Sequence, residues 1–315
     1  MVSSASGSAP SWASCSPSPH CSWPTATIAT GIRHYRKSDP HPSPIMPVEG
    51  PSSGAHRARD YAPERERTYH VSIVIGPEVS AWVARDMHDP QVLALAWGAG
   101  AEALHHPDLP QHPRSVTYVS LPQLSTLVPD GAIEPGTSAD HLKLVHGRIP
   151  AVAVREQPVE PLGAQCLYVN EAEHERRILD RYAFARSLPL QAVLVNSARE
   201  RSENGPVLVV HRGEERIDVA IADRNALLLS ASYPARTPSD VLYFCLLATE
   251  QTEHSPTTMA VRMGGTHITR ADRDLLSRYF SDAAPAWPWP QSQLFPAGME
   301  PERWLAAFDQ FTCVS

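Results

Sequence analysis

The order of predicted strands and helices repeats once along this chain. Residues 71–75, 79–84 and 92–97 are short apolar runs separated by turn residues, and they predict three consecutive strands. The same succession returns at residues 207–211, 217–222 and 226–233. This repeat predicts two α/β lobes of similar plan.

Further elements follow each set of three strands. In the first half, apolar patterns predict strands at residues 116–119 and 165–169 and a short helix at residues 139–145. A longer helix is predicted over residues 171–186, with Asn170 as its N-cap.

The second half continues with a strand predicted at residues 191–195. A helix capped by Thr237 is apolar on most sides as far as residue 253, so we expect it to lie buried between layers. After a strand at residues 259–263, Thr269 caps a helix that is expected to turn Tyr279 inward. The last predicted helix covers residues 300–308.

These elements predict an α/β fold of duplicated ribonuclease-H-like lobes, in which mixed sheets are flanked by helices. The first lobe is expected at residues 67–195 and the second at residues 196–315. Residues 1–66 are rich in Ser and Pro and show no periodicity, which predicts a disordered tail. An alternative is that translation starts at Met46, and nothing amphipathic in the tail favours a transit peptide.

Composition excludes several classes of function. The formal charge is -7 and no basic cluster is present, which argues against binding to nucleic acid. The 5 cysteines form no C-x-x-C pair, as is typical of a reducing cytoplasm. No apolar run approaches the roughly 18 residues that a membrane span needs. We therefore expect a cytoplasmic protein without a membrane span.

The most informative motif is the hairpin predicted at residues 211–221. It resembles the phosphate hairpin of actin-like ATPases, in which Asp-x-Gly is followed by a second Asp before an apolar strand. Gly213 and Asp218 match this pattern, whereas His211 stands where the leading Asp belongs. In the first lobe, Val74 occupies the position of the corresponding Asp.

A second motif follows the strand at residues 259–263. Gly264 and Gly265 resemble the adenosine turn of the same superfamily, where the backbone passes flat against the base and sugar. The resemblance implies a degenerate nucleotide pocket formed by His211, Gly213, Asp218, Gly264 and Gly265. It implies no catalytic residue, no bound metal and no resident cofactor, with weak binding of ATP at most.

Residues 69–310 are similar to an uncharacterised bacterial family known as domain of unknown function 3822. Tyr233, Thr237, Asp240 and Tyr243 carry this similarity. The family is similar to actin-like proteins of pilus and type II secretion assembly platforms, which act largely by holding partner proteins. The resemblance implies an actin-like fold and no established activity.

Three functions therefore stay open. The first is a non-catalytic scaffold or assembly factor with a protein partner that the sequence does not identify. The second is an ATP-binding ATPase or phosphotransferase of the same fold that uses substitute residues. Without hydrolysis, Arg212 or Arg216 would still neutralise a phosphate and give weak, metal-independent binding. The third is an accessory protein with an unknown partner. Glu214, Glu215 and Asp218 are more typical of a solvated hairpin than of a metal site.

Overall fold

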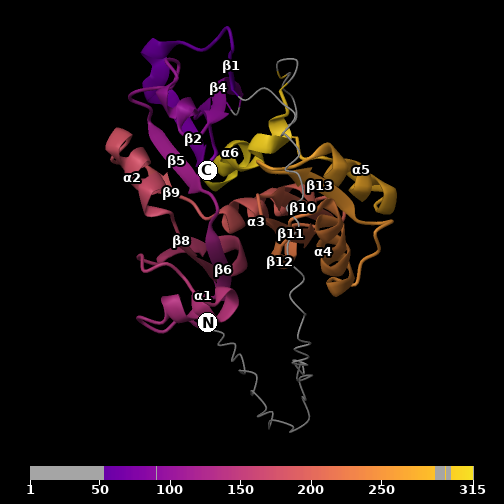
Figure 1. Ribbon diagram of the computed structural model, residues 1–315. Helices are drawn as coiled ribbons and strands as arrows, with labels where there is room; N and C mark the ends of the chain where they lie inside the picture. Colours follow the sequence, from indigo (N-terminus) through magenta and orange to yellow (C-terminus); the bar gives the residue numbers. More distant parts are fainter. Residues whose placement is uncertain (1–52, 90, 288–294, 296–298, 315) are drawn as a thin grey trace, which may run out of the picture. The chain divides into compact units, whose positions relative to one another are not determined.

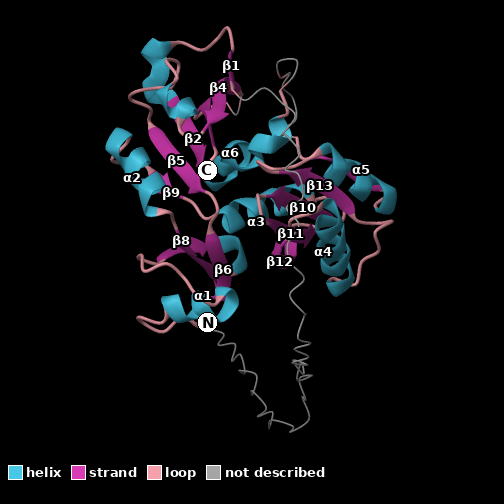
Figure 2. Cartoon of the chain, viewed as in Figure 1, coloured by secondary structure: helices cyan, strands magenta, loops and turns pink. Residues whose placement is uncertain are grey.

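The structure is a computed structural model, and it describes residues 53–89, 91–287, 295 and 299–314. Three sheets with helices around them make up this part of the chain (Figure 2). No helix among the described residues is long and apolar enough to cross a membrane.

The first sheet is built on an antiparallel meander. It consists of β2 (Tyr69–Ile75), β3 (Val79–Asp86) and β4 (Val92–Ala99). β5 (Ser115–Ser120) pairs parallel to β2, and β9 (Arg186–Ser187) pairs parallel to β5. β2 is buried along its whole length, as expected for a strand that is covered on both faces.

The second sheet repeats this plan. β10 (Val207–Arg212), β11 (Arg216–Asp223) and β12 (Ala226–Pro234) form an antiparallel meander. β13 (Ala260–Gly264) pairs parallel to β10, and β14 (Asp282–Pro285) pairs parallel to β13. The order β12-β11-β10-β13-β14 corresponds to β4-β3-β2-β5-β9 in the first sheet. The predicted duplicated fold is confirmed.

The first hairpin of each sheet closes in the same way. Gly76 N donates to Val79 O at 2.8 Å, and Gly213 N donates to Arg216 O at 2.9 Å. Aligning the two glycines equates Val74 with His211. Val74 lies opposite Ala81 in the register of its hairpin, as His211 lies opposite Asp218.

Each of these two sheets is covered by a helix from the other half of the chain. α3 (Leu190–Arg201) follows β9 but packs against β10, β11 and β12. α6 (Leu305–Asp309) comes after the second sheet but packs against β2, β3 and β5 (Figure 1). The lobe boundary that we expected between residues 195 and 196 lies inside α3.

The strand predicted at residues 191–195 is wrong, because these residues belong to α3. All five are buried, so the segment lacks an exposed face from which a helical or a strand period could be recognised.

The helices on the other face of the second sheet begin as predicted. α4 (Pro238–Gln251) and α5 (Arg270–Tyr279) each start with a capping box, formed by Thr237 with Asp240 and by Thr269 with Asp272. Two details differ from the prediction. Tyr243 of α4 is 61% exposed, because this helix covers only one face of the sheet, and Tyr279 is 53% exposed at the end of α5.

A smaller antiparallel sheet is inserted between β5 and β9. It contains β6 (Leu124–Pro129), β8 (Ala164–Val169) and β7 (Arg155–Val159), in that order, with α1 (Ser138–His146) packed against β6 and β8.

The helix predicted over residues 171–186 is shorter in the structure, where α2 covers Ala172–Arg181. Asn170 is not its N-cap. The Asn170 amide nitrogen donates to Ser187 Oγ at 2.7 Å, and its oxygen accepts from Gln123 Nε2 at 2.9 Å. This buried asparagine therefore ties the start of the helix to neighbouring segments instead of to the helix backbone.

Ordered structure begins before the point that the sequence predicted. β1 (Gly54–Arg57) pairs antiparallel with β4, and Tyr61 is buried with its hydroxyl donating to Asp108 O at 2.7 Å. The expectation of disorder up to residue 66 is therefore wrong for residues 54–66, because pairing with a sheet edge offsets the entropy cost of ordering them. Residues 1–52, including Met46, lie outside the described residues.

Short 3-10 helices complete the described elements, at Pro63–Thr68, Glu102–His105, Glu160–Leu162, Pro301–Trp304 and Gln310–Cys313. The last two flank α6, so the helix predicted over residues 300–308 is present as a 3-10 turn followed by an α-helix.

Candidate functional site

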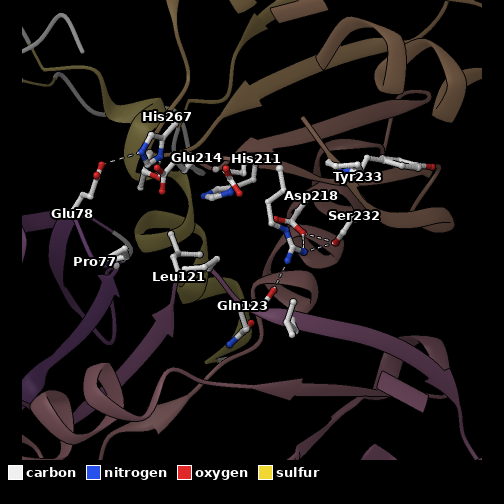
Figure 3. A pocket seen from close by; sticks show the side chains of 18 of the residues that line it. Pro77, Glu78, Leu121, Gln123, His211, Glu214, Asp218, Ser232, Tyr233 and His267 are labelled. Carbon is white, nitrogen blue, oxygen red and sulfur yellow. Dashed lines mark hydrogen bonds and ion pairs between the residues drawn. The ribbon is translucent and has the colours of Figure 1, made fainter. Parts of the chain in front are cut away.

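The tips of the two equivalent hairpins face one cavity of about 560 Å³. The first hairpin contributes residues 76–79, and the second contributes Gly213, Glu214 and Glu215 together with side chains from its strands. Figure 3 shows His211 and Asp218 on one side of this space and Pro77 and Leu121 on the other. We call this space the interlobe cavity.

His211 lies near the end of β10 and lines the interlobe cavity. Its side chain is buried, and neither ring nitrogen has a hydrogen-bond partner among the described residues. Burial lowers the pKa of His211 to about 4, with Arg216 and His267 adding to the effect and Asp218 opposing it. The imidazole is therefore neutral near pH 7 and offers one donor and one acceptor.

Asp218, opposite His211, is held by its neighbours. Both Arg216 Nη2 and Ser232 Oγ donate to Asp218 Oδ1, and Arg216 Nη2 also donates to Ser232 Oγ at 2.7 Å (Figure 3). Arg216 Nη1 donates to Gln123 O at 3.0 Å, which joins the second hairpin to the loop after β5. The charge of Asp218 is thus balanced inside the protein by Arg216.

At the positions equivalent to His211 and Asp218, the first hairpin has apolar side chains, and its Glu78 lines the cavity from the exposed tip. Val74 and the opposing Ala81 are 1% and 2% exposed and belong to the apolar cluster that also contains Phe308 of α6. Val79, equivalent to Arg216, lines the cavity with an aliphatic side chain. The two hairpins therefore share a backbone plan but differ in chemistry.

Gly264 and Gly265 do not line the interlobe cavity. A Cβ on Gly264 would lie 2.5 Å from Glu302 O, and one on Gly265, whose φ is +113°, would lie 2.4 Å from Arg212 N. Gly265 N donates to Glu302 O at 2.9 Å. The turn is therefore packed against the chain's own residues, and this close packing explains both glycines.

The structure thus brings together His211, Gly213 and Asp218 of the predicted site and places Gly264 and Gly265 outside it. Sequence reasoning missed Leu121 and His267, which follow the equivalent strands β5 and β13. The internal repeat is the signal that could have found them, because loops after equivalent strands reach equivalent ends of the two sheets.

Acidic side chains dominate the mouth of the cavity. Glu78, Glu214 and Glu215 are exposed. Glu78 Oε2 lies 3.6 Å from His267 Nε2, and Glu215 forms an exposed ion pair with Arg236 at 3.1 Å. Among the described residues, no group of three or more His, Cys, Asp or Glu side chains is placed to hold a metal ion.

Comparison with known proteins identifies the fold. A solved structure from Bacteroides thetaiotaomicron, described as a protein with actin-like ATPase fold and unknown function, is similar with a TM-score of 0.64 and 14% identity over 79% of this chain and 98% of that chain. This chain therefore has the actin-like ATPase fold that its hairpins indicated.

Two further structures are similar at lower scores. The cytoplasmic domain of EpsL, an inner membrane component of the type II secretion system of Vibrio cholerae, has a TM-score of 0.41 and 14% identity over 78% of this chain and 95% of its own. A chain of the PilM-PilN type IV pilus biogenesis complex has a TM-score of 0.43 and 11% identity over 79% and 98%.

No curated protein sequence matches this chain. Residues 103–282 match the family described as "Protein of unknown function (DUF3822)". Because the match covers more than half of the chain, the protein belongs to this family, as its sequence indicated.

Proposed function

We propose that this protein is a non-catalytic scaffold or assembly factor that does not use magnesium-ATP. The observation that carries the proposal is the chemistry of the two hairpins at the interlobe cavity. In the actin-like fold, the resemblance implies a carboxylate at the positions of Val74 and His211. Here one position is a core valine and the other a buried neutral imidazole.

These residues do not fit magnesium, which prefers oxygen ligands in octahedral geometry. Among the described residues, Asp218 is the one buried carboxylate that lines the cavity, and it already accepts hydrogen bonds from Arg216 and Ser232. The remaining carboxylates of the lining are exposed at the hairpin tips.

The arginines that sequence analysis offered for a phosphate are also engaged. Arg212 is buried, and its Nη1 donates to Ala235 O at 2.5 Å. Arg216 donates to Asp218, Ser232 and Gln123 O. A phosphate would have to displace these contacts and approach exposed Glu214 and Glu215, which disfavours it electrostatically.

A scaffold role is supported by an aromatic group on the second lobe. Tyr233 stacks on Phe244 with ring centroids 4.7 Å apart, and Tyr243, 61% exposed, contacts Phe244 edge-on. Aromatic side chains of this kind are enriched in protein interfaces.

Calorimetry of the full chain with ATP, with and without magnesium, tests the proposal together with a phosphate-release assay. We expect no magnesium-dependent heat at micromolar protein and no release of phosphate above the rate without protein. Micromolar affinity that requires magnesium, or steady turnover, would show that substitute residues support the enzyme function instead.

A further inference from the structure

The interlobe cavity keeps features of a ligand site although it does not fit a magnesium-bound nucleotide. Its volume of about 560 Å³ lies within the range of small-molecule pockets. Much of its wall is aliphatic, with Val79, Leu121 and Leu124 around the space that His211 faces. Such a wall favours an apolar skeleton.

At this wall, the ring of His211 has hydrogen-bonding capacity that no described residue satisfies. A buried polar side chain without a partner is costly, and most such groups in folded proteins are paired. Here both ring nitrogens lack a partner among the described residues, while the ring lines the cavity. A ligand with an N–H group that reaches the ring would donate to its unprotonated nitrogen.

Asp218 provides a second hydrogen-bond acceptor beside the unprotonated ring nitrogen of His211. Both of the hydrogen bonds that it accepts from described residues go to Oδ1, so Oδ2 retains its capacity to accept. Asp218 is 7% exposed, and its interaction with a donor is therefore less screened than one at the surface.

The charge of the lining decides which ligand fits. Among the described residues of the lining, Glu78, Glu214, Glu215 and Asp218 carry carboxylates and Arg216 carries a guanidinium. Arg216 pairs with Asp218, and Arg236, outside the lining, pairs with Glu215, so Glu78 and Glu214 leave an excess of negative charge. This excess of negative charge repels anions and attracts cations. The negative charge favours a ligand with a positive charge, and the buried acceptors on His211 and Asp218 favour a ligand with N–H donors. An ammonium group has both properties.

We propose that the interlobe cavity binds a small organic cation, an ammonium group on an apolar skeleton, with the ammonium directed toward Asp218 and His211 and the skeleton against Leu121 and Val79. The site has the opposite charge preference to a nucleotide site. It is independent of the scaffold role, since it concerns what occupies the cavity and not whether ATP is used.

A matched set of probes tests this inference. Phenethylammonium, 2-phenylethanol and phenylacetate share an aromatic skeleton and differ in charge at pH 7. We expect calorimetry on the full chain to show that the ammonium compound binds roughly fivefold more tightly than the alcohol, the size of one partly solvated charge interaction, and that phenylacetate binds most weakly. Equal affinities, a preference for phenylacetate or absence of binding by all three would overturn the proposal.

Substitutions at the cavity mouth test whether the preference for the ammonium compound arises in the interlobe cavity. The double variant Glu78→Gln/Glu214→Gln removes two exposed charges at the mouth, so we expect it to reduce the preference for the ammonium compound roughly twofold or more. Glu203→Gln, an exposed glutamate outside the cavity lining, is the control and should leave it unchanged. A preference unaffected by the double variant would place the binding elsewhere.

Nuclear magnetic resonance of chain labelled with ¹³C-histidine gives a readout at the buried ring. The resonance of His211 is the one lost in His211→Gln. We expect it to shift on addition of phenethylammonium, with a smaller change for phenylacetate. If this resonance did not shift at a saturating concentration of phenethylammonium, the result would contradict the proposed site. If His211→Gln does not fold, the calorimetric series decides the proposal.

Discussion

A buried ion pair joins α3 and α6, the two helices that each pack on the sheet formed by the other half of the chain. Arg201 of α3 and Asp309 of α6 lie 2.9 Å apart with side chains 5% and 0% exposed. Ser197 Oγ donates to Asp309 Oδ2 at 2.7 Å, and Arg201 Nη2 donates to Trp287 O at 2.8 Å. The pair therefore connects α3, which covers the second sheet, to α6, which covers the first.

Replacing Asp309 with Ala should be among the most damaging single changes in this protein. The substitution leaves Arg201 charged, buried and without its carboxylate, which typically costs about 3 to 5 kcal/mol. By contrast, Arg201→Met/Asp309→Leu removes both charges and fills the space with apolar atoms. We expect the double variant to recover part of the lost free energy of unfolding, because the buried charge of Arg201 is removed with its partner, whereas buried Arg85, whose pKa Asp309 raises, still loses this carboxylate.

Urea denaturation of the full chain, followed by circular dichroism, measures these differences. Asp180→Ala serves as the control, because Asp180 is 69% exposed and forms a long ion pair of 3.9 Å with Arg176. We expect this control to change the free energy of unfolding by less than about 0.5 kcal/mol. If Asp309→Ala cost no more than Asp180→Ala, or if the double variant were no better than Asp309→Ala, the ion pair would not join the helices as argued.

Three further predictions concern the glycine turn, the buried His211 and Tyr61 in the N-terminal segment. Gly265→Ala should lower the free energy of unfolding by about 2 kcal/mol or more in urea, since its φ is +113° and a Cβ would lie 2.4 Å from Arg212 N; a neutral change would contradict the packing argument. Burial lowers the pKa of His211 to about 4 from an ordinary value of 6.5, so between these pH values the unfolded state binds more protons and stability falls as the pH falls, by up to about 1.4 kcal/mol per pH unit. Burial also lowers the pKa of His70, to about 3, and that of His174, so both contribute to the same slope. In denaturation measured from pH 7 to pH 4.5, His211→Phe should remove the part of the slope that His211 contributes, and an unchanged slope would count against a neutral buried His211. Tyr61→Ala should cost about 3 kcal/mol by the same denaturation assay, because the ring is 6% exposed in an apolar cluster with residues of β2 and β4; a loss below about 1 kcal/mol would restore the interpretation of this segment as a tail.

Local signals in the sequence predicted the parts of this fold that local chemistry determines. The capping boxes at Thr237 and Thr269 specify helix starts through contacts within a few residues, and both are confirmed. The exchange of α3 and α6 rests on contacts between distant segments, such as Arg201 with Asp309, so no pattern along the chain reveals it. The Gly264–Gly265 turn shows the same limit, because its glycines accommodate Glu302 and Arg212, which lie far away in the sequence.

The apolar character of the first hairpin is coupled to how the lobes are held together. Val74 and Ala81 lie in one apolar cluster with Val195 of α3 and Phe308 of α6. A carboxylate at residue 74 would enter this cluster, where burial of an unpaired charge is strongly unfavourable. In the second hairpin the equivalent positions remain polar, because His211 and Asp218 line a cavity instead of packing against a helix. The two hairpins therefore differ in what they contact: the first packs in an apolar cluster with α3 and α6, and the second places polar side chains on the wall of the interlobe cavity.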